Sequence, residues 1–142
     1  MANDRVNNQR RSLRLKDYNY GGPGAYFVTI CTRDRLPLFG GIVEGRMRLT
    51  EYGRIVSQEW KISATIRQEL TLDAFVVMPN HVHGVVIIDE SNVGATGGSP
   101  VRLGPHQRFL GSFLSGFKSA TTKRINDLQR TSALSVLSLI HI

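Results

Sequence analysis

Residues 71–88 of the chain are TLDAFVVMPNHVHGVVII, a stretch in which two apolar runs flank the dipeptide Pro79-Asn80. Both runs are rich in β-branched residues, which favour strands. Proline presets the first position of a tight turn, and asparagine tolerates a left-handed conformation in the next position. The stretch therefore predicts a β-hairpin whose turn lies at Pro79-Asn80.

The segments before this hairpin predict a strand, a second hairpin and a helix. Residues 25–32 (AYFVTICT) have the composition of a strand, and Gly45 separates two short runs that are typical of a hairpin. A helix is expected to begin after Thr50, whose side chain can cap it. Its approximate apolar stripe is expected to contain Ile55, Trp60 (or Glu59), Ile62 and Ile66.

The segments after the hairpin predict a flexible loop and a second helix. Residues 89–104 are rich in glycine and serine, and residues 105–130 have apolar side chains at helical spacing. That stripe comprises Leu110, Phe113, Leu114, Phe117, Thr121, Ile125 and Leu128, and we expect it to pack in the core. The resulting order indicates an α+β domain, with helices on one face of an antiparallel sheet and the other face open.

The composition favours a nucleic-acid partner. Lysine and arginine number 18 against 11 acidic residues, a net charge of +7, and 14 of the 18 are arginine. Arginine binds phosphate oxygens bidentately, so such a surplus fits DNA or RNA, although a solvated basic surface would have the same charge. Residues 1–24 form a basic arm that ends in a Gly-Gly-Pro-Gly turn.

Other features predict a cytoplasmic protein rather than a membrane or secreted one. No run approaches the roughly 18 apolar residues that span a bilayer, and the N-terminus is polar rather than a signal peptide. The single cysteine, Cys31, cannot form an internal disulfide, and its apolar neighbours predict that it is buried.

The residues with the clearest chemical potential are His81 and His83. Alternate residues of a strand point to the same face, so the two imidazoles are expected to project together while Val82 faces the core. Two imidazoles at this spacing can share one metal ion and leave its other positions open to substrate. Two ordinary surface histidines are the alternative. Gly84, the next residue, is expected to let a backbone or ligand approach closely.

The run FVVMPNHVHGVVII resembles the HUH motif of the REP-associated tyrosine transposases and of the related single-tyrosine insertion-sequence transposases. The resemblance extends to the segments RRSLRLKDYNYGGPGAYFVTICTRDRLPLFG, LTEYGRIVSQEW and GSFLSGFKSATTKRIN, which appear in the order of that family. It covers roughly residues 10–130. It implies a ferredoxin-like sheet and a metal site at His81 and His83.

The resemblance also implies an activity, a cofactor and a partner. The partner would be single-stranded DNA with hairpin-forming repeats, and the reaction would be strand cleavage and joining through a 5′-phosphotyrosine intermediate. The divalent metal would stabilise charge on the scissile phosphate. Imidazole ligands favour Mn²⁺ on chemical grounds, whereas the family suggests Mg²⁺ equally. A monomer and a homodimer both remain compatible with the resemblance.

The nucleophile that the family requires is missing from its expected place. All four tyrosines precede the histidine pair, and residues 131–142 form an atypical tail, TSALSVLSLIHI, without a tyrosine. The tail resembles a translated sequencing adapter, so we expect a C-terminal truncation, with a divergent C-terminus as the alternative. The domain itself would span residues 25–130. An inactive transposase domain is therefore predicted. A DNA-hairpin-binding module and a relaxase-like enzyme that uses Tyr18 or Tyr20 are the alternatives.

The arginines and lysines nearest to these motifs are the candidate DNA contacts. Contacts with phosphate would make affinity fall steeply with salt. The candidates are Arg10, Arg11, Arg14 and Lys16 in the arm, Arg33 and Arg35 after the first strand, and Lys118, Lys123 and Arg124 on the second helix.

Overall fold

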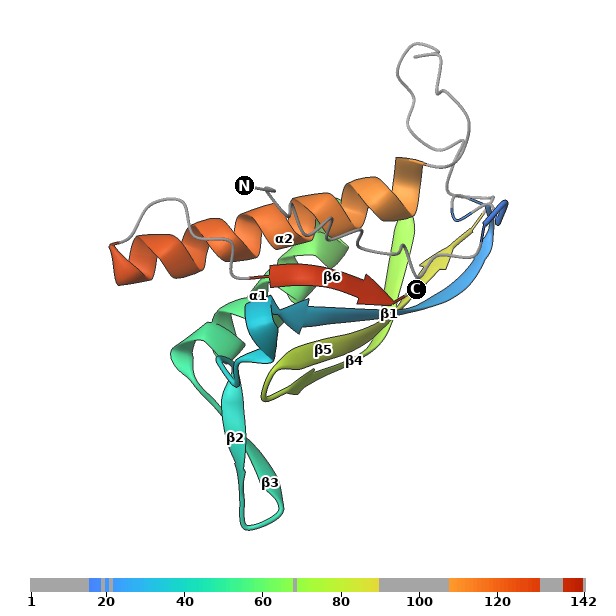
Figure 1. Ribbon diagram of the computed structural model, residues 1–142. Coiled ribbons are helices and arrows are strands. Elements are labelled where there is room, and N and C mark those ends of the chain that lie inside the picture. The colour runs from blue at the N-terminus through green and yellow to red at the C-terminus, as the bar shows by residue number, and fades with distance from the viewer. Residues whose placement is uncertain are drawn as a thin grey trace, which may run out of the picture.

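Figure 1 shows the computed structural model, which describes residues 16–18, 20, 22–67, 69–89, 108–130 and 137–141. These described residues form six strands and two α-helices, with a short turn, η1, after the first strand. The elements are β1 (Gly24–Thr32), η1 (Arg33–Arg35), β2 (Gly40–Val43), β3 (Arg46–Leu49), α1 (Glu51–Ile66), β4 (Leu70–Met78), β5 (His81–Ile88), α2 (Arg108–Gln129) and β6 (Leu137–His141).

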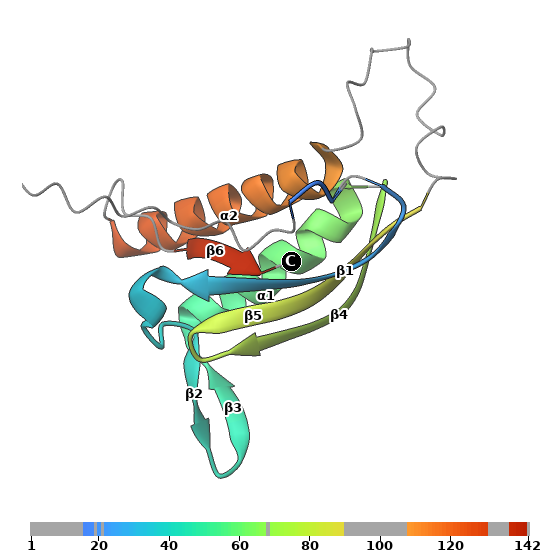
Figure 2. The ribbon, with the colours of Figure 1, turned by 45° about the vertical axis from the view of Figure 1, so that its right-hand side comes forward.

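The main sheet has four strands in the order β4-β5-β1-β6, and every neighbouring pair is antiparallel. Figures 1 and 2 show α1 and α2 together on one side of this sheet. If the β2–β3 hairpin is set aside as an insertion between β1 and α1, the chain order is βαββαβ. The predicted α+β, ferredoxin-like fold is confirmed.

The strand β6 lies in the segment that the sequence set apart as an atypical tail. Residues 137–141 pair with β1 as an edge strand, and Leu137 is 6% exposed within the core. The pairing places β1 in the interior of the sheet, where Val28 and Ile30 are fully buried. The tail therefore supplies the fourth strand of the fold rather than an appendage.

The β4–β5 hairpin forms as predicted. Met78 pairs with His81, so Pro79 and Asn80 make the two-residue turn. Along β5 every second residue is buried, beginning with Val82, and the residues between are half-buried. One face of the strand thus packs against the helices and the other belongs to the open side of the sheet.

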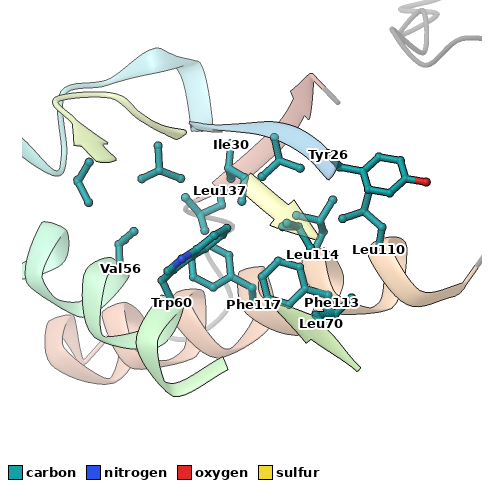
Figure 3. Close-up of a cluster of buried hydrophobic side chains, with 14 of the residues drawn as sticks. Tyr26, Ile30, Val56, Trp60, Leu70, Leu110, Phe113, Leu114, Phe117 and Leu137 are labelled. Atoms are coloured by element: carbon teal, nitrogen blue, oxygen red, sulfur yellow. The ribbon is translucent and has the colours of Figure 1, made fainter. Parts of the chain in front are cut away.

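The core is centred on Trp60 of α1, which lies between the sheet and α2 (Figure 3). Its ring stacks on Phe75 with centroids 4.4 Å apart, and it meets Phe113 and Phe117 edge-on at 5.5 and 5.6 Å. A Cβ atom on Gly84 would lie 2.4 Å from this indole. The close approach at Gly84 is thus with the tryptophan ring in the core, whereas the sequence suggested a backbone or a ligand.

Both predicted helices form, with adjusted boundaries and stripes. Thr50 caps α1 by accepting a hydrogen bond from the Gly53 N–H at 3.3 Å. The predicted apolar stripe of α1 is wrong at Ile62 and Ile66, because these side chains are 43% and 70% exposed. The buried stripe of α1 runs instead through Gly53, Ile55, Val56, Glu59 and Trp60, and that of α2 matches the predicted residues except Leu128.

Within the described ranges, no helix is both long and apolar enough to cross a membrane.

Candidate functional site: a histidine pair on the open face of the sheet

His81 and His83 project together from β5 on the face away from the helices, as the alternation of the strand predicted. Val82 between them is 1% exposed and points into the core. The Nε2 atoms of the two imidazoles are 3.1 Å apart, and the rings meet edge-on with centroids 4.6 Å apart. His81 directly follows the Pro79-Asn80 turn, so the pair lies at one end of the sheet.

A second polar group fixes the orientation of His81. The side-chain Nδ2 of Asn80 donates to the Arg35 carbonyl at 3.1 Å, so its Oδ1 faces the imidazole. That oxygen can only accept, and it accepts a hydrogen bond from Nδ1 of His81 at 2.7 Å. In the neutral ring the proton is therefore on Nδ1, and Nε2 presents a lone pair toward His83.

His83 has a more adaptable partner. Its Nδ1 lies 2.8 Å from Oγ1 of Thr29 on the neighbouring strand β1. A hydroxyl can donate or accept, so either tautomer of His83 is satisfied. With Nε2–H donating to His81, the threonine donates to Nδ1. When the proton is on Nδ1, this N–H donates a hydrogen bond to the threonine hydroxyl. The Nε2 atoms of both His81 and His83 then have a free lone pair.

These donors fit a divalent metal ion. A metal–nitrogen bond is about 2.1 Å, so one ion can reach two nitrogens that are 3.1 Å apart. Each imidazole has its other nitrogen bonded to an outer partner, which is the usual arrangement of metal-bound histidine. In the part of the chain that the structure describes, no third His, Cys, Asp or Glu completes a larger metal-holding group.

The surroundings of His81 favour its neutral form. Partial burial, followed by the charges of His83 and Arg35, holds the pKa of the His81 imidazole below its ordinary value. A neutral imidazole is the form that binds metal. The structure thus brings together three of the predicted site residues: His81, His83 and Arg35.

The open face around the pair is largely apolar. Phe27, 57% exposed, stacks on His83 with ring centroids 5.1 Å apart. Cys31 pairs with His81 across the strands and is partly exposed, which contradicts the expectation that it is buried. The reason is the alternation of side chains along β1. Ile30 and Thr32, on either side of Cys31, face the core, so Cys31 faces the open side of the sheet.

The predicted DNA contacts fall into separate groups. Arg10, Arg11 and Arg14 lie outside the described residues, and Lys16 is exposed. Arg33 and Arg35 belong to η1, which follows β1 at the end where Cys31 pairs with His81. Arg33 contacts only its neighbour Asp34, at 3.9 Å, among the ion pairs of the described chain.

The cations of α2 lie in the helical layer, on the opposite side of the sheet from the histidines. Arg124 donates to the buried Glu59 of α1 at 2.7 Å, and Lys123 pairs with Asp127 at 3.6 Å on the surface of its own helix. Lys118 is on the same helix. The structure therefore does not bring Lys118, Lys123 or Arg124 to the histidine pair.

The tyrosines considered as alternative nucleophiles pack elsewhere. Tyr18 meets Tyr20 edge-on at 4.9 Å, and Tyr20 lies 6.3 Å from the buried ring of Tyr26. In the pairing of β1 with β5, His81 lies opposite Cys31, and Tyr26 is five residues from Cys31 along β1. At about 3.3 Å per residue, this is a separation of about 17 Å along the strand.

Sequence reasoning missed Asn80, Thr29 and Phe27 as members of this site. Asn80 was interpreted only as a turn residue, although its position beside His81 was visible. Thr29 and Phe27 lie more than fifty residues away, and only the register of β1 against β5 places them at His83. No signal in a single sequence fixes that register.

Comparison with known proteins places this geometry in context. No protein-family model matches the chain. An uncharacterised protein of Haemophilus influenzae is 38% identical over 120 residues, which cover 80% of this chain and 66% of that protein. The chain thus spans slightly less than two thirds of this relative.

Two solved structures share the fold. A candidate transposase from Deinococcus radiodurans aligns with a TM-score of 0.50 and 18% identity over 81% of this chain and 68% of its own. The REP-associated tyrosine transposase bound to a REP hairpin aligns with a TM-score of 0.52 and 15% identity over 90% of this chain and 60% of its own. The domain therefore has the fold found in these transposases, as the sequence resemblance led us to expect.

Proposed function

We propose that this chain is the metal- and DNA-binding domain of a REP-associated tyrosine transposase or a close relative, which acts on single-stranded DNA. The proposal rests on one observation above all. Two imidazoles present their Nε2 atoms 3.1 Å apart on an open sheet face, and each has its other nitrogen bonded to a neighbouring polar group. The shared fold and the motif resemblance support the same conclusion.

His81 and His83 would hold the metal through their Nε2 atoms, with Asn80 and Thr29 as outer partners. A bound divalent ion, Mn²⁺ or Mg²⁺, would supply electrostatic stabilisation of charge on a scissile phosphate. Arg35 would add a second positive charge near the same phosphate, because its backbone carbonyl is bonded to Asn80, the residue next to His81. Phe27 offers an exposed aromatic ring on which a base of the bound strand can stack.

Binding without cleavage is the second candidate for the sequence as it stands. Complete strand cleavage needs a nucleophilic oxygen that attacks phosphorus and displaces a 3′-hydroxyl. The sequence has no tyrosine after Tyr52, and Tyr18 and Tyr20 pack near Tyr26 rather than at the histidines. This observation favours a domain that binds metal and a DNA hairpin and leaves the covalent step to a group outside it.

The metal site is tested by titrating the protein with Mn²⁺ and measuring binding by calorimetry and by the electron spin resonance of free Mn²⁺. We expect one ion per chain, with binding abolished in His81→Asn and in His83→Asn. Val85→Ala is the matched control, because Val85 is the next residue of β5 on the same face. Wild-type affinity in both histidine variants would disprove the site.

The DNA function is tested with a labelled DNA hairpin that carries a single-stranded flank. We expect binding in gel shift that strengthens with Mn²⁺ and weakens with salt. Denaturing electrophoresis of the same mixture separates the two candidate functions. A covalent protein–DNA adduct would show that the chain contains its own nucleophile, whereas binding without an adduct supports the binding module. No binding at any salt concentration would contradict both.

A further inference from the structure

The β2–β3 hairpin is not required by the ferredoxin-like core. It forms a separate sheet of two strands, inserted between β1 and α1. In Figures 1 and 2 it extends away from α2, beyond the edge of the main sheet. Its turn residues, Glu44 and Gly45, both have positive φ, of 50° and 72°, which suits a tight two-residue hairpin turn.

The base of the hairpin is held firmly. Phe39, which precedes β2, is fully buried, and its carbonyl accepts a hydrogen bond from the Thr50 N–H at 2.9 Å. A Cβ atom on Gly53 of α1 would lie 2.2 Å from that carbonyl, so helix and hairpin base are in backbone contact. The hairpin therefore projects in a defined direction.

The same base is joined to the histidine site. The Phe39 N–H donates to the carbonyl of Pro79 at 3.0 Å, and the Thr32 N–H donates to the carbonyl of Asn80 at 2.9 Å. Pro79 and Asn80 form the turn that carries His81. The hairpin thus starts from the end of the sheet at which the histidine pair lies.

One face of the hairpin is cationic. Arg46 and Arg48 are two residues apart on β3, so they point to the same side, and both are exposed. Opposite them on β2 lie Val43 and Gly41, neither of which carries a charge. Among the described residues, no carboxylate forms an ion pair with either arginine.

We propose that Arg46 and Arg48 of this hairpin bind the phosphate backbone of DNA next to the strand held at the histidine pair. This inference rests on the proposed function and names a contact surface beyond it. Arginine side chains bind phosphate bidentately. A two-stranded β-ribbon is also narrow enough to enter the major groove of a DNA duplex. The base of the hairpin is bonded to the turn that carries His81, so the two arginines lie on an element that projects from the metal-site end of the sheet.

The test compares salt dependence of DNA binding between two double variants. Arg46→Gln with Arg48→Gln removes the cationic face, and Arg54→Gln with Lys61→Gln removes the same charge from exposed positions of α1. Each protein is titrated with three oligonucleotides: a hairpin with a single-stranded flank, the stem alone and the flank alone. Mn²⁺ binding and thermal unfolding are measured on the same samples.

We expect the hairpin variant to lose on the order of tenfold in affinity at about 0.1 M salt. The slope of log K against log salt should fall by roughly 1.4 if the arginines bind the single-stranded flank and by roughly 1.8 if they bind the stem. The two shorter oligonucleotides identify which. Mn²⁺ binding should be unchanged, and the α1 variant should keep the wild-type slope.

The two proposals fail in different ways. If the wild-type chain binds DNA and the hairpin variant keeps the wild-type slope and affinity, the hairpin contact is disproved and the proposed function stands. An equal loss in the α1 variant would also disprove it, because the effect would then be one of net charge. If the wild-type chain binds no DNA, both proposals fail.

Discussion

Thr29 and Asn80 show how residues outside the metal-binding motif prepare it. Asn80 dictates the tautomer of His81 because its carboxamide is oriented by the Arg35 carbonyl. Thr29 leaves the tautomer of His83 free to change. In the free protein His83 can therefore carry its proton on Nε2, between the two rings, and when a cation takes that place the neutral ring can carry it on Nδ1 instead.

Substitution of Thr29 tests this difference. Valine has the same shape as threonine but cannot accept a hydrogen bond from Nδ1–H of His83, so Thr29→Val should weaken Mn²⁺ binding by about 10- to 100-fold. Thr29→Ser keeps the hydroxyl and should bind nearly as the wild type. Calorimetric titration gives both affinities, and equal affinities for the valine and serine variants would show that the threonine has no part in metal binding.

Gly84, next to His83, affects the opposite side of the sheet. A Cβ atom there would overlap the Trp60 ring at 2.4 Å, so Gly84→Ala should destabilise the fold by about 1–3 kcal/mol. Gly111→Ala is the control, because its Cβ would meet no neighbour within 4 Å and helical alanine is favoured by about 0.5–1 kcal/mol. Urea unfolding measures both. If Gly84→Ala leaves the free energy of unfolding unchanged, the indole of Trp60 moves aside without cost.

At the scale of the elements, the two helices are joined by a buried ion pair that the sequence did not reveal. Glu59 is 6% exposed, and its carboxylate binds Arg124. Removing one partner leaves a buried charge uncompensated, a change of several kcal/mol when the pair is fully enclosed. Here the Arg124 side chain is 39% exposed, so the effect is smaller.

Two variants of α2 should therefore behave differently. Arg124→Met should lower the free energy of unfolding by about 2 kcal/mol, whereas Lys123→Met, which breaks an exposed pair with Asp127, should change it by at most about 0.5 kcal/mol. Thermal unfolding followed by circular dichroism distinguishes them. If the two variants unfold alike, the Glu59–Arg124 pair contributes nothing special to the packing of the helices.

The sequence predicted elements well and their mutual placement less well. Strand composition, the Pro79-Asn80 turn and helical periodicity are local, so both hairpins and both helices could be inferred. The α1 stripe was assigned too far toward its C-terminus, because Ile62 and Ile66 are apolar and yet exposed. The role of Arg124 and the register that brings Thr29 to His83 depend on contacts between distant segments, which periodicity does not encode.

At the scale of the whole molecule, β6 decides whether β1 is an interior strand. Without β6, the N–H and C=O groups along one side of β1 would be an unpaired edge. The core would also lose the buried side chain of Leu137, the first residue of β6. Exposed edges of this kind pair readily with other chains.

A variant that ends at residue 130 should therefore be less stable and should associate as concentration rises. Size-exclusion chromatography with light scattering measures the association, and urea unfolding measures the stability. Replacing residues 137–141 by a polar segment of equal length is the control for chain length, and it should behave like the shortened variant. A shortened variant that stays monomeric with wild-type stability would show that β6 adds little to the sheet.

The alternation along β5 has a consequence for how such proteins diverge. Along this strand, residues that pack in the core alternate one by one with residues that face the histidine site, and the two sets lie on opposite sides of the sheet. Exchange of the outward residues therefore costs little packing, and one scaffold can acquire new chemistry while its core stays filled.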